Sequence, residues 1–177
     1  MSGMFLGRGL CLPGGFAAFA LCLVACAEPA VPSTTAARVE SLQCPGVRQD
    51  EVAVVQRLSV LSATPIYTVQ PSKDGDGQRV SGVKLVVRPP EGDGVTPERL
   101  TRTLQCHTAR ALLGQVDRSQ LADDPYWLPD EWLDISVVSE DGNYAVALRA
   151  DSIAKNLEVL NRVTSYARTH GALRTAQ

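Results

Sequence analysis

The side chains of this 177-residue chain best suited to chemistry are those of its cysteines and histidines. Cys106 and His107 are neighbours, and thiolate and imidazole are both ligands for zinc and similar metal ions. Adjacent residues on a helix point about 100° apart, so one ion held by both would sit in a strained arrangement. Further ligands would have to come from Cys44 or His170. A metal site at Cys106 and His107 is therefore only a minor alternative, and we expect no metal and no cofactor.

Cys44 and Cys106 can instead bond to each other. In an oxidising compartment, such an even pair is typical of a structural disulfide. The bond would close a loop of about 63 residues and contribute roughly 4 kcal/mol through loop-closure entropy. A redox pair is less favoured, because redox motifs place their cysteines close together, as in Cys-x-x-Cys. In the disulfide interpretation, His107 is a partly buried helical residue bonded to a backbone carbonyl.

A cluster of acidic residues is the next candidate site: Asp123, Asp124, Asp130, Glu131 and Asp134. Paired carboxylates can perform acid–base chemistry or hold Ca²⁺, but this spacing matches no calcium-binding loop. We expect a solvated loop whose acids cap helices. The chain also has no Gly-x-Ser-x-Gly, no His-Glu-x-x-His and no phosphate-binding loop. We therefore predict no catalytic residues and a protein that is not an enzyme.

Three of the aromatic residues, Tyr126, Trp127 and Trp132, lie close together in the sequence. Tyr and Trp bury large areas while keeping a polar group, and they are common anchors of protein interfaces. If buried, they fix this aromatic loop to the fold. If exposed, they form a possible interface for a protein, a peptide or a glycan. Both interpretations stand on the sequence alone.

The N-terminal segment has the composition of an export signal. Residues 1–25 carry one charged side chain, Arg8, and end in an apolar run that is shorter than the about 20 residues of a membrane-spanning helix. That run closes with Leu23-Val24-Ala25-Cys26, which resembles the lipobox of bacterial lipoproteins. An N-terminal transmembrane anchor and an ordinary cleaved signal are the alternatives.

The lipobox resemblance implies specific chemistry at Cys26. Its thiol would receive a diacylglyceryl group, cleavage would precede it, and the new amino terminus would be acylated, typically with palmitate. Two or more acyl chains anchor a protein stably. Residue 27 is Ala, not the Asp that tends to retain lipoproteins at the inner membrane. The expected location is the cell envelope, lipid-anchored at the outer membrane on its periplasmic or surface face.

Composition divides the rest of the chain. After a signal peptide over 1–25, residues 26–43 are rich in Ala, Pro, Ser and Thr and predict a lipid-anchored flexible tether. Residues 44–172 are long enough for a single domain, and 173–177 should fray. The net charge is −2 and no basic block is present, so nucleic acid is not expected as a partner.

Hydrophobic periodicity predicts an α+β order of elements. Strands are expected over 53–61 (a helix over 50–61 being the alternative), 66–70, 82–88, 133–137 and 144–148. One helix should run from the Thr96 N-cap to Gly114, and another from Asp151 or Ser152 to Gly171. The expected fold is an antiparallel or mixed sheet of four or five strands with both helices on one face. Its βαββα part resembles a ferredoxin-like unit lacking the last strand, and the aromatic loop could cover the open face.

The segments GVKLVVRPP, TPERLTRTLQCHTARALLG and DDPYWLP are similar to envelope lipoproteins to which no activity is assigned, so the resemblance transfers no catalytic residue. The sequence thus predicts a lipid-anchored envelope protein that acts as a non-enzymatic binding or interaction domain. Its partners would be the membrane, through Cys26, and an envelope protein. The alternative is a metal- or redox-handling periplasmic lipoprotein using Cys106 and His107 with Cys44.

Overall fold

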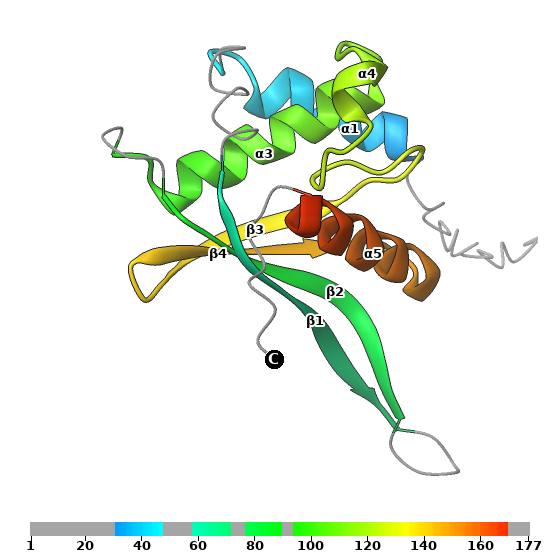
Figure 1. Cartoon of the computed structure of the whole chain (residues 1–177). Coiled ribbons are helices and arrows are strands. Elements are labelled where there is room, and N and C mark those ends of the chain that lie inside the picture. The colour runs from blue at the N-terminus through cyan, green and yellow to red at the C-terminus, as the bar shows by residue number, and fades with distance from the viewer. Residues whose placement is uncertain (1–30, 48–57, 72–76, 90–93, 170–177) are drawn as a thin grey trace, which may run out of the picture.

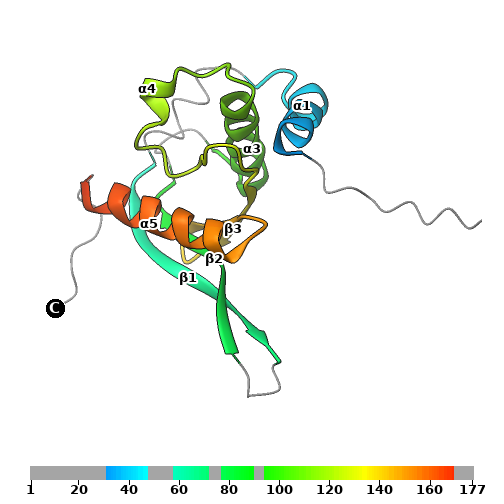
Figure 2. The ribbon, with the colours of Figure 1, turned by 90° about the vertical axis from the view of Figure 1, so that its right-hand side faces the viewer.

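The computed structural model describes residues 31–47, 58–71, 77–89 and 94–169. A single four-stranded antiparallel sheet forms its base, and helices cover one of the two faces (Figures 1 and 2). The strands are β1 (Val60–Gln70), β2 (Gly77–Val87), β3 (Asp134–Glu140) and β4 (Asn143–Arg149), and the helices are α1 (Pro32–Gln43), α3 (Pro97–Leu112), α4 (Arg118–Leu121) and α5 (Ile153–Thr169). The predicted α+β class is confirmed.

The order of strands across the sheet is β1-β2-β4-β3, and every neighbouring pair is antiparallel. Strands β2 and β3 are therefore parallel to each other, with β4 between them and α3 as their crossover, which is a split βαβ arrangement. The upstream strand β1 occupies the edge beside β2. The place that the βαββα unit leaves vacant is thus filled from earlier in the chain.

The core lies between the sheet and helices α3 and α5. Alternate residues of the strands face it, so that Leu85 on β2 lies between Ala63 on β1 and Val146 on β4. This period-2 pattern is the one that the sequence of residues 82–88 displays. The buried cluster also takes in Tyr126 and Leu128 from the aromatic loop. That loop therefore packs into the core between α3 and α5, on the helix side of the sheet, and the expectation that it covers the open face is wrong.

Some element boundaries differ from those expected. The strands expected over 53–61 and 66–70 are replaced by the single strand β1, which starts at Val60 and passes through Pro65. Residues 53–57 lie outside the described residues. Pro65 lacks an N–H, but an edge strand tolerates this because only one side of its backbone must pair. A register shift after Ile66 then turns the β1–β2 hairpin beyond the helices (Figure 1).

Local signals fixed the other elements as expected. The Thr96 side chain accepts a hydrogen bond from the Arg99 N–H at 3.3 Å, and Gly114, with φ of 71°, follows the end of α3. The β3–β4 turn places Asp141 and Gly142 at positive φ, as two-residue hairpin turns require. Ser152 accepts from the Lys155 N–H at the start of α5.

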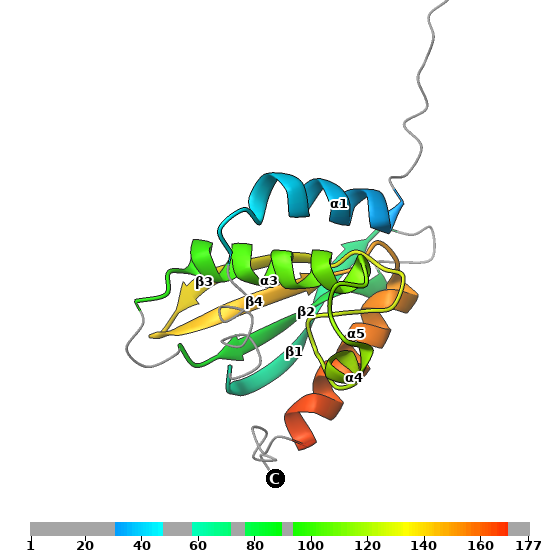
Figure 3. The same ribbon diagram turned by 90° about the horizontal axis from the view of Figure 1, so that it is seen from above.

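The flexible tether predicted over 26–43 is wrong for residues 32–43, which form α1. Pro32 occupies the first turn, where its missing N–H costs nothing. Ala36 and Val39 are buried against α3, and Figure 3 shows α1 lying beside α3 on the side away from α5. The folded domain therefore includes residues 32–43, which the prediction had placed in the tether. None of the described helices is long and apolar enough to cross a membrane.

Side chains of α3 cover the β3 edge of the sheet. Outward-facing backbone groups of β3 are satisfied by side chains of α3: Gln105 Nε2 donates to the Ile135 carbonyl at 3.0 Å, and the Val137 N–H donates to Thr101 Oγ1 at 3.1 Å. These bonds fix α3 along the β3 edge. They also block that edge against pairing with another strand.

Candidate functional site

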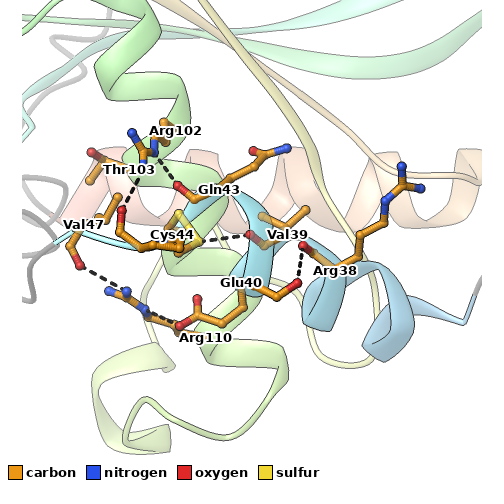
Figure 4. Close-up of a disulfide and its surroundings, with 12 residues drawn as sticks. Arg38, Val39, Glu40, Gln43, Cys44, Val47, Arg102, Thr103 and Arg110 are labelled. Atoms are coloured by element: carbon orange, nitrogen blue, oxygen red, sulfur yellow. Dashed lines mark hydrogen bonds and ion pairs between the residues drawn. A yellow bond between two sulfur atoms is a disulfide. The ribbon is translucent and has the colours of Figure 1, made fainter.

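The Cys44–Cys106 disulfide lies at the contact between α1 and α3 (Figure 4). The sulfurs are 2.13 Å apart, the Cα atoms are 5.6 Å apart, and both residues are buried. Cys106 is on the flank of α3, where the helical spacing predicts it, and Cys44 directly follows the end of α1. The predicted disulfide is confirmed, and it joins elements 62 residues apart in the sequence.

Two arginines of α3 reinforce this contact from either side of the disulfide. Arg102 donates to the Gln43 carbonyl and, at 2.9 Å, to the Pro45 carbonyl. Arg110 contacts the Glu40 carboxylate at 3.3 Å and donates to the Val47 carbonyl at 3.1 Å (Figure 4). These bonds satisfy the carbonyl of Gln43, the last residue of α1, and two carbonyls of the segment that follows the helix. The link between α1 and α3 is thus covalent, polar and apolar at once.

The disulfide removes both sulfurs from the set of possible metal ligands. The metal-site alternative required thiolates from Cys106 and Cys44, and a bridged sulfur is not a thiolate. His170 lies outside the described residues. Among the described residues, no group of three or more His, Cys, Asp or Glu side chains is placed to hold a metal ion.

His107 is fully buried, one helical position from the disulfide. Its Nε2 hydrogen bonds to Asp124 Oδ2, so the expected backbone carbonyl partner is wrong and a carboxylate takes its place. Asp124 Oδ1 also accepts from the Tyr126 N–H at 2.8 Å, and Thr108 donates to the Tyr126 carbonyl at 2.9 Å. The buried carboxylate of Asp124 would be costly without these partners, so the loop is stable only where it meets His107 and Thr108. The network therefore fixes the aromatic loop to α3.

The acidic cluster does not converge on one site. Asp124 is buried against His107, whereas Asp123, Asp130 and Asp134 are exposed, and Glu131 accepts from the Asp151 N–H at 3.3 Å. Asp130 adopts a positive φ of 57°, a conformation that Asp tolerates better than most residues in tight turns. Asp130 therefore serves the backbone of a turn, and Glu131 fixes the start of the segment before α5. The described carboxylates of the cluster are not paired for acid–base chemistry.

Tyr126 is 2% exposed and belongs to the core, so it is not an interface residue. Burial raises the pKa of its phenol well above the ordinary value, and the nearby Tyr166 and Asp124 add to that effect. Among the described residues, its hydroxyl has no hydrogen-bond partner. The possible interface at Tyr126, Trp127 and Trp132 therefore does not include Tyr126.

The two tryptophans have different surroundings. Trp132 is partly buried against the small cluster that surrounds the disulfide. Trp127 is half-buried, and the guanidinium of Arg162 lies 5.3 Å from the centre of its ring. Arg162 also donates to the backbone carbonyls of Asp124 and Ala122, at 2.7 and 2.8 Å. It therefore ties α5 to the aromatic loop, a role for which the sequence offers no local signal.

Trp127 also lines a cleft of about 350 Å³ at the C-terminal end of α3. Most of its lining residues are apolar, although polar atoms make up the larger share of the exposed cleft surface. Arg118 and Asp130 supply one charge of each sign, and the remaining lining residues are Ala111, Leu112, Gly114, Val116, Leu121 and Pro129. The indole Nε1 is buried and has no hydrogen-bond partner among the described residues. A concave surface with an aromatic side chain and both polar and apolar groups in its wall can accept a ligand or a partner's side chain.

Sequence reasoning placed a binding surface on the aromatic loop but missed this cleft. Part of the cleft is formed by α4, a single turn whose start is marked by the Asp117 side chain accepting from the Ser119 N–H at 2.8 Å. Asp117-x-Ser119 is a capping signal that could have identified it. No family model matches the chain, and neither a curated protein nor a solved structure matches it.

Proposed function

We propose that this protein is a lipid-anchored component of the bacterial cell envelope, whose disulfide-bonded domain binds another envelope protein and performs no catalysis. The observation that carries the proposal is the Leu23-Val24-Ala25-Cys26 motif at the end of an apolar N-terminal segment. The Cys44–Cys106 disulfide supports it, because such bonds persist in oxidising compartments, including the periplasm and the cell surface.

The cleft beside Trp127 is the proposed contact with the partner protein. Interface anchors are typically aromatic or aliphatic side chains that fill pockets, surrounded by a polar rim. The cleft offers the pocket, and Arg118 and Asp130 offer a rim that pairs with charges of either sign. Its volume of about 350 Å³ suits one or two inserted side chains. Trp127 replaces the three-residue aromatic interface as the residue on which recognition depends.

The metal- or redox-handling alternative is disfavoured, because a metal site needs free thiolates and a redox pair needs a disulfide that another thiol can reach. Its thiols are bonded to each other, and the imidazole Nε2 of His107 is occupied by Asp124. A protein of that type would need accessible ligands, whereas Cys44, Cys106 and His107 are all buried.

The anchor is tested in bacterial cells grown with an alkyne analogue of palmitate. The full chain should incorporate the label and fractionate with membranes, and Cys26→Ser should abolish both properties. Cys22→Ser, a change of a cysteine within the same apolar run, is the matched control and should keep the label. Label that persists in Cys26→Ser, or never appears in the unaltered chain, contradicts the lipid anchor.

The contact is tested by photocrosslinking of the full chain in cells. A photoreactive amino acid at Arg118 should capture a discrete partner, and adding Trp127→Ala should remove that product. The same probe at Val138, which is exposed on β3, is the control and should not capture it. An adduct pattern that is unchanged by Trp127→Ala in a folded protein rules out the cleft as the interface.

A further inference from the structure

A helix that packs on the domain begins only a few residues after the proposed lipid anchor. Only residues 27–31 separate Cys26 from Pro32, the first residue of α1. Fully extended, this connection spans about 20 Å, and as a flexible chain it averages about 13 Å. A helix that packs on the domain thus begins within a short reach of the membrane surface.

This short reach depends on α1 remaining docked on α3. The disulfide, the two arginines and the buried Ala36 and Val39 hold it there. If α1 were released, the next of the described residues that is buried in the main core would be Leu58. The connection from Cys26 would then average about 30 Å and could extend to about 110 Å.

The contacts also give α1 a direction. Glu40 pairs with Arg110, and Gln43, later in α1, pairs with Arg102, earlier in α3. The two helices are therefore antiparallel, and Pro32 lies towards the C-terminal end of α3 (Figure 3). On β3, Ile135 contacts Gln105, and the later Val137 contacts the earlier Thr101, so β3 also runs antiparallel to α3. The β3–β4 turn therefore lies at the N-terminal end of α3, opposite to Pro32.

The geometry points to α1 as a stapled spacer: docked on α3 by the Cys44–Cys106 disulfide, it holds the domain against the lipid surface with the C-terminal end of α3 and the Trp127 cleft facing the bilayer. This inference rests on the proposed lipid anchoring of Cys26. It adds that the partner at the cleft must itself lie at the membrane surface, because the short connection cannot carry the cleft far into the periplasm.

The distance between the domain and the lipid surface is measured by fluorescence energy transfer on vesicles. The chain from Cys26 onward, which includes every described residue, is coupled through the Cys26 thiol to a maleimide lipid in phosphatidylcholine vesicles with acceptor-labelled headgroups. A fluorescent amino acid at Ser119 on α4, or at Ser139 near the β3–β4 turn, is the donor; both positions are exposed. Transfer should be clearly greater from Ser119 than from Ser139.

Two variants release α1 by independent routes. Cys44→Ser/Cys106→Ser removes the covalent link, and Ala36→Glu places a charge in the α1–α3 contact while leaving the disulfide in place. Each should lower transfer from Ser119 at least twofold, since transfer falls steeply with distance. The average connection lengthens to about 23 Å in Ala36→Glu, where the disulfide keeps Cys44 fixed, and to about 30 Å in the double variant. A flexible insertion after Ala30 is the positive control for a longer connection, and Ser41→Ala on the exposed side of α1 should change nothing.

The outcomes separate this inference from the proposed function. Equal transfer from the two donor positions, or unchanged transfer in either release variant that keeps its circular dichroism spectrum, overturns the spacer. Because the maleimide coupling replaces biological acylation, the spacer is tested even if the palmitate experiment shows that Cys26 is not lipidated in cells. Failure of the anchor and failure of the spacer are therefore distinct results.

Discussion

His107 on α3 and Asp124 after α4 hydrogen bond to each other inside the protein, with 0% and 5% of their side chains exposed. The pair joins the helix that carries the disulfide to the loop that carries Trp127. Breaking it by removing one partner leaves a buried polar group without compensation. The shape of the cleft wall therefore depends on a polar contact that lies out of the reach of any ligand.

The first prediction concerns this pair. Asp124→Ala should lower the free energy of unfolding by about 3 kcal/mol, because it strands His107 and removes the acceptor of the Tyr126 N–H. Urea denaturation measures the change. Asp123→Ala, at the exposed neighbouring position, should stay within about 0.5 kcal/mol of the unaltered protein. A loss below 1 kcal/mol for Asp124→Ala would falsify the structural role given to the pair.

The second prediction concerns the disulfide. Cys44→Ala/Cys106→Ala should lower the free energy of unfolding by roughly 4 kcal/mol, because the unfolded chain regains the entropy of a loop of about 63 residues. In the unaltered mature chain, a thiol reagent should react with Cys44 and Cys106 only after reduction. Rapid labelling of both in the non-reduced, folded protein would show that the bond does not form.

The third prediction concerns alkaline pH. Burial raises the pKa of the Tyr126 phenol in the folded protein, whereas the same phenol ionises near pH 10 in the unfolded chain. Above pH 10, the unfolded state is therefore stabilised by losing the phenol proton and the folded state is not. The free energy of unfolding should therefore hold below pH 10 and fall as pH rises above it. Tyr126→Phe should make that fall shallower and cost little at pH 7, since it removes a hydroxyl without a partner among the described residues. If the free energy of unfolding fell equally steeply above pH 10 in the unaltered protein and in Tyr126→Phe, the prediction would be wrong.

The fourth prediction concerns Gly82 on β2. A Cβ there would lie 2.7 Å from the Leu148 carbonyl oxygen of the neighbouring strand, which cannot move without disturbing the sheet. Gly82→Ala should destabilise the protein by about 1–3 kcal/mol. Gly77→Ala meets no atom within 4 Å and serves as the matched control. Thermal melts compare the two, and equal melting temperatures would contradict the close approach.

The fifth prediction concerns the β3 edge. Thr101→Val/Gln105→Leu removes the side chains that bond to Val137 and Ile135, which leaves edge backbone groups available to another chain. The double variant should form dimers or aggregates in size-exclusion chromatography. Gln120→Leu, which adds the same apolar side chain at an exposed position, should remain like the unaltered protein; if both behave alike, the edge is not what the two side chains protect.

The sequence by itself determined the elements whose signals are local. Alternation of Val83, Leu85 and Val87 specified β2, Thr96 and Gly114 bounded α3, and Asp141-Gly142 specified the β3–β4 turn. The even pair of cysteines predicted the disulfide, because the choice of partner was already reduced to one. Each of these inferences needs only neighbouring residues or simple counting.

Only the tertiary structure decided what the aromatic loop and the segment before Cys44 do. Residues 32–43 have few apolar side chains, and α1 is stable because α3 supplies the disulfide and the arginine contacts. Tyr126 is core and Trp127 lines a cleft because His107 on α3 and Arg162 on α5, distant in sequence from the loop, both bind it at Asp124. Burial depends on contacts between residues far apart in the chain, and local patterns carry no information about them.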